Sequence, residues 1–159
     1  MESANPLVSA VEPLLANDAV DWDAVLEQLT SHCDCPVGTV HLMDASGMLK
    51  LTAHRGLPPP VVEKVAVIPV GKGMAGIAAE RKEPVQVCNL QTDDSGVVRP
   101  GAKLTQMEGS IAVPMMAGAD ETQVVGVLGV AKPVAYEFTQ EQADNLMAVG
   151  RRLGRKIQG

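Results

Sequence analysis

Two strand–turn–strand patterns lie far apart in this chain, and their separation limits the folds that it can adopt. Residues 37–43 and 48–55 are strand candidates on either side of a turn-forming Asp-Ala-Ser-Gly stretch, and residues 110–116 and 124–132 form the second pair. No regular alternation of strands with long helices joins the two pairs. The order therefore predicts an α+β fold in which both hairpins join one antiparallel sheet.

Helical patterns flank the two hairpins. Asp21 is a candidate N-cap, and residues 22–33 after it carry apolar side chains at helical spacing. Near the other end, Thr139 and Gln142 form a capping box, and an apolar stripe follows them. We therefore predict one helix before the first hairpin and a longer one after the second.

The segment between the hairpins mixes short elements with a long loop. Residues 61–67 and 74–81 predict one or two helical turns and a short Ala-rich helix, and Val85, Val87 and the residues that flank them predict a further strand. Residues 90–108 are polar and rich in turn formers, as is typical of a loop. A loop of this length often carries function.

Length and charge limit the organisation and the partners. The 159 residues fit one domain, which we assign to residues 20–159, with an N-terminal arm or helix over residues 1–19. The formal net charge of -6 disfavours nucleic acid and anionic membrane surfaces as partners. The start of the chain lacks a secretory signal pattern, and no apolar stretch approaches the roughly 20 residues of a membrane span. We therefore expect a cytoplasmic protein.

The cysteines and aromatic residues are few. Cys33, Cys35 and Cys88 are expected to be free thiols in a reducing compartment. The chain has three aromatic residues and eight methionines. Because pockets for flat ligands usually stack them on aromatic rings, any pocket here is expected to be aliphatic and lined by methionine.

A glycine-rich segment matches a nucleotide-binding pattern. Residues 71–76, Gly-Lys-Gly-Met-Ala-Gly, fit G-x-G-x-x-G, and Asp93 and Asp94 follow about twenty residues later. The helix after this segment is too short for a typical crossover, and no later strand–helix units are present to build a parallel sheet. We favour a glycine-rich turn that lets a helix pack close to a sheet, with a dinucleotide site as the alternative.

No catalytic or metal-binding motif is found. The three cysteines and the three histidines match no standard zinc spacing, although His32 beside Cys33 leaves a metal or redox site as an alternative. His41 and His54 fall on adjacent predicted strands, where they either face each other or, as we favour, serve as separate polar groups. No Ser-His-Asp order, H-E-x-x-H or Walker motif occurs. We predict neither catalytic residues nor a metal site.

Several segments in order resemble the hallmark stretches of GAF domains. They are IPVGKGMAGIAA at residues 68–79, GSIAVPM at 109–115, VGVLGV at 125–130 and FTQEQA at 138–143. The likeness extends over nearly the whole chain. It implies a fold related to the PAS domain, with a five- or six-stranded antiparallel sheet. The terminal helices would pack on one face, and a pocket covered by a helix and a loop would lie on the other.

The resemblance also implies a function. GAF domains typically bind small effectors or mediate dimerisation, so we expect a sensing or dimerisation module of cytoplasmic signalling without catalysis of its own. The effector and any cofactor stay unidentified. A homodimer through the terminal helices is expected, with a possible separate output protein and with neither nucleic acid nor membrane as partner.

One branch of the family is enzymatic, the free methionine-(R)-sulfoxide reductases. Its members use cysteines, one of them in the segment that corresponds to residues 71–79, where this chain has none. Neither Ala nor Met can replace a thiolate nucleophile. A thiol-dependent reductase using Cys33, Cys35 and Cys88 is therefore the alternative function.

Candidate ligand-binding residues are those that flank the cavity implied by the resemblance. They are Met74, Asn89, Asp93, Arg99, Ser110 and Met115.

Overall fold

The computed structural model describes residues 5–93 and 105–158. Its strands form one antiparallel sheet in the order β3-β2-β1-β6-β5-β4. The predicted α+β class and the antiparallel sheet are thus confirmed, with six strands. The strands are β1 (Val37–Met43), β2 (Met48–Arg55), β3 (Val67–Pro69), β4 (Val85–Val87), β5 (Ser110–Ala117) and β6 (Gln123–Ala131).

The two predicted hairpins meet at the centre of the sheet. β1 pairs with β2, β5 pairs with β6, and β1 and β6 join the two hairpins. The short strands β3 and β4 lie at opposite edges. Among the described strands every pairing is antiparallel, so the glycine-rich residues 71–76 connect two edges of an antiparallel sheet. A dinucleotide site needs a parallel strand–helix–strand unit, and the alternative interpretation of these residues therefore lacks its scaffold.

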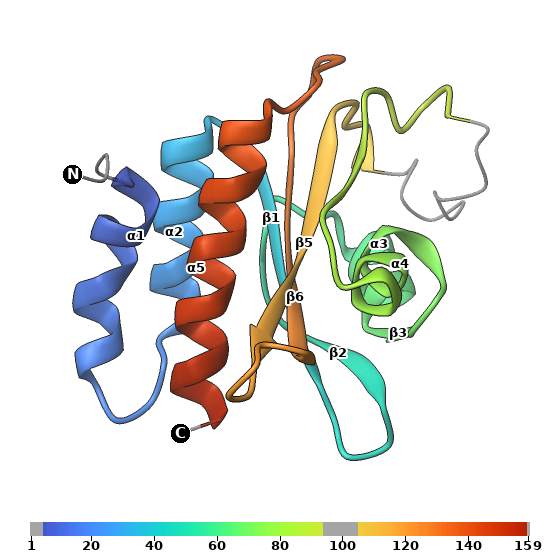
Figure 1. Ribbon diagram of the computed structural model, residues 1–159. Helices are drawn as coiled ribbons and strands as arrows, with labels where there is room; N and C mark the ends of the chain where they lie inside the picture. Colours follow the sequence, from blue (N-terminus) through green and yellow to red (C-terminus); the bar gives the residue numbers. More distant parts are fainter. Residues whose placement is uncertain (1–4, 94–104, 159) are drawn as a thin grey trace.

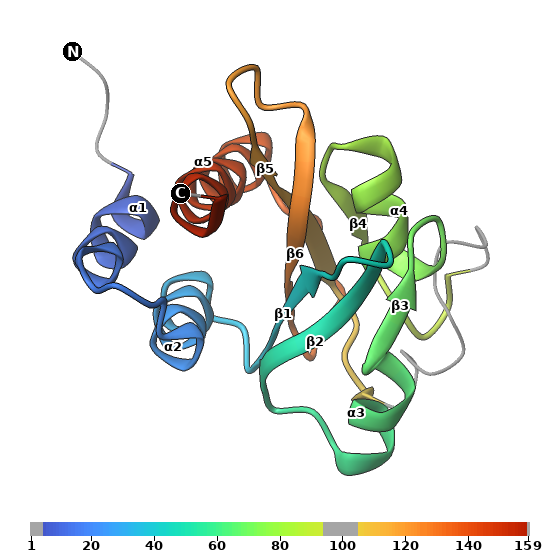
Figure 2. The same ribbon diagram turned by 90° about the horizontal axis from the view of Figure 1, so that it is seen from below.

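Helices cover both faces of the sheet (Figure 1). α1 (Pro6–Val11), a short 3-10 helix (Glu12–Ala16), α2 (Trp22–Cys33) and α5 (Gln140–Gln158) lie on one side. α3 (Pro59–Val65) and α4 (Gly73–Arg81) lie on the other, as the view from below also shows (Figure 2). The structure extends helix α3 only to Val65 and places residue 67 in β3, where the sequence pattern predicts the end of a helix.

The predicted helix caps are present. The Asp21 carboxylate accepts a hydrogen bond from the Ala24 amide at 3.1 Å. At the start of α5, the Thr139 hydroxyl accepts from the Gln142 amide at 3.1 Å, and the Gln142 side chain accepts from the Thr139 amide at 2.8 Å. These bonds satisfy backbone N–H groups that have no partner within the helix.

Strand side chains alternate between two apolar layers. Leu128 and Val130 of β6 pack with α2 and α5 in the helix-side core, whereas Val127 faces α4 in the α4-side core. β5 is buried along almost its whole length for the same reason. Because both faces are covered, the sheet separates two compartments, and only the α4 side contains the cavity described below.

Helix α5 lies very close to the sheet. A Cβ atom added to Gly150 would lie 2.9 Å from the Pro114 carbonyl oxygen, and one added to Gly154 would clash with the Met116 carbonyl. The two glycines therefore set the distance between α5 and β5. The long C-terminal helix is part of the core of the domain, and it is not an appendage.

Candidate functional site

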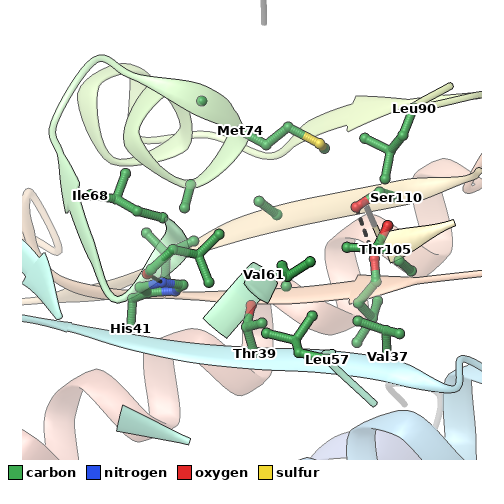
Figure 3. Close-up of a pocket in the computed structure, with 18 of the residues that line it drawn as sticks. Val37, Thr39, His41, Leu57, Val61, Ile68, Met74, Leu90, Thr105 and Ser110 are labelled. Atoms are coloured by element: carbon green, nitrogen blue, oxygen red, sulfur yellow. Dashed lines mark hydrogen bonds between the residues drawn. The ribbon is translucent and has the colours of Figure 1, made fainter. Parts of the chain in front are cut away.

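A cavity of about 480 Å³ lies between the sheet and the layer formed by α3 and α4 (Figure 3). This volume falls within the roughly 300–1,000 Å³ typical of small-molecule sites. Strands β1, β5 and β6 provide its floor. The lining residues are Val37, Thr39, His41, Leu57, Val61, Lys64, Val65, Ile68, Gly73, Met74, Ala75, Leu90, Thr105, Ser110, Ile111, Ala112, Val127, Gly129, Val130 and Ala131.

Small residues at the centre of the floor keep the cavity open. Thr39, Gly129 and Ala112 lie side by side on β1, β6 and β5. A Cβ atom at Gly129 would come within 2.8 Å of the Thr39 hydroxyl oxygen, which is closer than an ordinary contact. The absence of a side chain at Gly129 therefore leaves room for the Thr39 hydroxyl on the floor.

The walls are aliphatic. Ile68, Met74 and Leu90 surround the space opposite the floor (Figure 3). The three aromatic residues lie elsewhere, because Phe138 belongs to the helix-side core and Trp22 and Tyr136 pack against it. Recognition of a ligand in such a space relies on shape and apolar contact, and a few polar groups set the orientation.

His41 supplies the most buried polar group of the lining. The residue is 2% exposed, and its Nε2 atom lies 2.8 Å from the carbonyl oxygen of Val65. Its Nδ1 atom has no hydrogen-bond partner among the described residues. Burial lowers the pKa of His41 below its usual value of 6.5, against the opposing effect of the Val65 hydrogen bond. The imidazole is therefore neutral at pH 7.

Two further polar residues stand at other points of the lining. The Ser110 hydroxyl donates to the Val130 carbonyl at 3.2 Å and retains lone pairs that can accept from a ligand. Lys64, near the end of α3, is exposed and is the one charged side chain among the described lining residues. Figure 3 places His41 and Ile68 at one end of the space and Ser110, Thr105 and Leu90 at the other.

Two of the predicted site residues line the cavity, namely Met74 and Ser110. Their binding of a ligand stays a prediction. Asn89 does not line it: its side chain donates to Glu108 at 3.2 Å and accepts from the Gln91 amide at 2.9 Å, so it joins the two ends of the β4–β5 connection.

The remaining predicted site residues lie in other places. Asp93 is not among the lining residues, and its amide donates to the Asn89 carbonyl at 3.0 Å. Met115 does not flank the cavity, contrary to the prediction, because its fully buried side chain belongs to the helix-side core. Arg99 lies outside the described residues.

Sequence reasoning missed Thr39 as a site residue and gave His41 no binding role. Both alternate with Val40, a core residue, along a strand that was predicted with the correct bounds. The alternation of side chains along this strand was the sequence signal that could have placed Thr39 and His41 on the face opposite Val40. The pairing of His41 with His54 is wrong, since a bulge between Val40 and His41 sets His41 opposite Leu51 and His54 opposite Thr39.

The three cysteines are all in the described part of the chain, and none lines the cavity. Cys33 and Cys35 flank the C-terminal end of α2, and burial raises the pKa of the Cys35 thiol to about 12, against a smaller effect of Lys132. Burial also raises the pKa of Cys33. Both are therefore poor sources of thiolate at neutral pH. Within the described residues, no three His, Cys, Asp or Glu side chains gather as metal ligands.

Comparison with known families assigns the fold. A family model described as "GAF domain" matches residues 22–158. The chain belongs to the GAF domain family. The resemblance inferred from residues 68–79, 109–115 and 125–130 is thus confirmed. No curated protein matches the chain.

Solved GAF domains have the same architecture. A GAF domain from an Acinetobacter phosphoenolpyruvate-protein phosphotransferase aligns over 98% of this chain and 95% of its own, with 19% identity and a TM-score of 0.74. The A. aeolicus nlh2 GAF domain aligns over 96% and 93%, with 20% identity and a TM-score of 0.72. At this identity the likeness concerns the fold alone.

Enzymes are found among the structural neighbours as well. A free methionine-R-sulfoxide reductase from Neisseria meningitidis, solved with its substrate, aligns over 99% of this chain and 93% of its own, with 18% identity and a TM-score of 0.75. The two GAF domains and the reductase thus share one fold, and the distinction between binding and catalysis depends on the residues of the site. In the described part of this GAF domain, no helix has the length and apolar character to cross a bilayer.

Proposed function

We propose that this GAF domain is a small-molecule sensor of cytoplasmic signalling, without catalysis of its own. The observation that carries the proposal is the apolar cavity of about 480 Å³ with few polar groups on its lining. Such a composition suits binding and orientation of a small molecule. Among the described lining residues, His41 and Ser110 each hydrogen-bond to a main-chain carbonyl and lie at opposite ends of the cavity (Figure 3), so they do not form a nucleophile–base pair.

The sheet supplies a route from the cavity to the helices. Val127 and Leu128 are neighbours on β6. Val127 faces the cavity and Leu128 packs in the helix-side core, so this strand contacts both compartments. Leu90 and Thr105, at the two ends of the β4–β5 connection, also line the cavity. We infer that an effector stabilises one arrangement of this connection and of the sheet, and thereby shifts the packing of α2 and α5.

Dimerisation through the terminal helices is part of the proposal, with a separate output protein as the further partner. α5 is itself a core element, so removing it would test folding and not association. The subunit number of the whole chain, read from native mass spectrometry, is the appropriate measurement. Two copies are expected, and a monomer at all concentrations would contradict this part of the proposal.

The reductase alternative has no support at the cavity. Cys33, Cys35 and Cys88 lie away from the lining, and burial raises the pKa of the first two. We therefore do not propose a thiol-dependent reaction there. Turnover of methionine sulfoxide with dithiothreitol, lost on replacing the three cysteines by serine, would contradict this choice.

The proposal is tested by filling the cavity. Leu in place of Thr39 adds apolar bulk on the floor, beside Gly129. Freshly purified wild-type protein should retain a non-covalent small molecule in native mass spectra, or should gain thermal stability from a low-molecular-weight cell extract. Thr39→Leu should show neither effect.

Thr52→Leu is the matched control. Thr52 is exposed on β2 and lies outside the cavity, so this variant should behave as the wild type does. Absence of both effects in the wild type, or an equal stabilisation in Thr39→Leu, would contradict a sensing role for the cavity.

A further inference from the structure

We propose that the effector is a small, neutral, predominantly apolar molecule whose N–H or O–H group donates a hydrogen bond to Nδ1 of His41. The inference rests on the proposed sensing function, and it names the chemical class that this particular cavity selects. It depends on three properties of His41: its tautomer, its burial and the chemistry of its surroundings.

The tautomer follows from the partner of Nε2. The carbonyl oxygen of Val65, 2.8 Å away, can only accept a hydrogen bond, so Nε2 must carry the proton. In a neutral imidazole the other nitrogen then has a free lone pair. Nδ1 of His41 is therefore an acceptor, and a group that satisfies it must be a donor.

This acceptor is buried without a partner. His41 is 2% exposed, and Nδ1 has less than 1 Å² of accessible surface and no hydrogen-bond partner among the described residues. Nearly all buried polar atoms in folded proteins have a partner, since an unpaired one weakens the folded state. The edge of the cavity thus contains a buried hydrogen-bond acceptor that has no donor among the described residues.

The surroundings decide which donors fit. Among the described lining residues no carboxylate is present, and Lys64 is the one charged group. An ammonium donor would lose its hydration in an apolar space without a counter-charge, which is strongly unfavourable. A neutral indole, phenol, amide or alcohol group meets the need without that cost.

Access to Nδ1 requires a small adjustment. Because the atom has almost no exposed surface, the side chains that cover it must shift as the donor arrives. Ile68 lies at the same end of the cavity as His41 in Figure 3. A rotamer change of such a side chain is fast and does not need a change in the backbone.

A shape-matched pair of probes tests the inference. Indole carries one N–H donor, and benzofuran has the same bicyclic shape with an oxygen acceptor in its place. Titrations of uniformly ¹⁵N-labelled full-length protein, followed by NMR, give both dissociation constants. Indole should bind about three- to tenfold more tightly than benzofuran, the effect expected of one net hydrogen bond.

His41→Gln removes the acceptor and retains a donor for Val65. The glutamine amide reaches about as far as Nε2, and it offers no lone pair at the position of Nδ1. In this variant the preference for indole should disappear. The control is His54→Gln, the same substitution at an exposed position of β2 outside the cavity lining, and the preference should persist there.

The tautomer and the hydrogen bond of His41 can also be tested on the wild-type protein alone. The ¹⁵N signal of His41 Nδ1 should be that of an unprotonated nitrogen, and it should shift on adding indole but not on adding benzofuran. Equal affinity for the two probes would overturn the inference and leave the proposed function intact, and so would an equal preference for indole in His41→Gln. If neither probe perturbs a cavity residue, both the inference and the proposed function fail.

Discussion

The ammonium group of Lys132 lies 2.7 Å from the carbonyl oxygen of Cys33 and 3.0 Å from that of Asp34, and so closes the C-terminal end of α2. Asp34 adopts a left-handed backbone conformation that ends this helix. Lys132 is 8% exposed, and its ammonium group lies 4.7 Å from the centre of the Tyr136 ring. A cation at the negative end of a helix dipole is stabilising. This contact therefore joins the residue that follows β6 to the end of α2, on the side of the sheet opposite the cavity.

Replacement of Lys132 by Met should destabilise the domain. Met keeps most of the volume and removes the donor, and two helix-end carbonyls then lose a charged partner. We expect a loss of about 2 to 3 kcal/mol in the free energy of unfolding, measured by urea denaturation. Lys156→Met, in the last turn of α5, should change it by less than about 0.5 kcal/mol. Equal effects of the two substitutions would refute this role of Lys132.

The contact between α5 and β5 predicts an unusual response to alanine. Gly→Ala inside a helix normally stabilises by up to about 1 kcal/mol. At Gly154 the added methyl group meets the Met116 carbonyl, so the sheet must move. Gly154→Ala should therefore cost about 1 to 3 kcal/mol, as overpacking does, with Lys156→Ala as the control. A stabilised Gly154→Ala protein would show that the helix is free to shift outward.

The pH dependence of stability should contain a contribution from His41. Burial lowers its pKa in the folded state below the usual value of 6.5, so the unfolded chain binds the proton more readily. The folded state is then favoured above pH 6.5 and loses stability as the pH falls from 6.5 toward the lowered pKa. Denaturation midpoints measured across this range should fall more steeply for the wild type than for His41→Gln. Parallel curves would mean that His41 titrates alike in both states.

Thiol reactivity should follow burial. Cys88 is exposed, whereas Cys35 is 3% exposed and its pKa is raised to about 12 by burial. Iodoacetamide at neutral pH should modify Cys88 first in native protein, and Cys35 should react only after unfolding. Peptide mass spectrometry over time gives the order. Rapid alkylation of Cys35 in the native protein would reopen the reductase alternative.

Local signals predicted most of the elements. The capping box at Thr139 and Gln142 and the turn between β1 and β2 are set by neighbouring residues, and both appear as expected. β3 was not predicted, because its three residues become a strand only by pairing with β2 at the sheet edge. The bulge between Val40 and His41 depends likewise on a partner strand.

The site was harder to predict than the fold. Ser110 and Met115 were both assigned to the cavity, yet they lie five residues apart on one strand, and strand alternation puts them on opposite faces. That error was avoidable from the sequence. The role of His41 as a hydrogen-bond acceptor could not be predicted from the sequence. Its tautomer depends on the carbonyl of Val65, which is 24 residues away in the chain.

Chemical-shift mapping with indole shows whether this cavity is the sensing site. If it is, saturable changes should be largest at the amides of Thr39, Ala112 and Gly129 on the cavity floor, and they should be lost in Thr39→Leu. Changes that do not saturate, or that are largest in the helix-side core around Leu146 and Leu153, would contradict the assignment of this cavity as the sensing site.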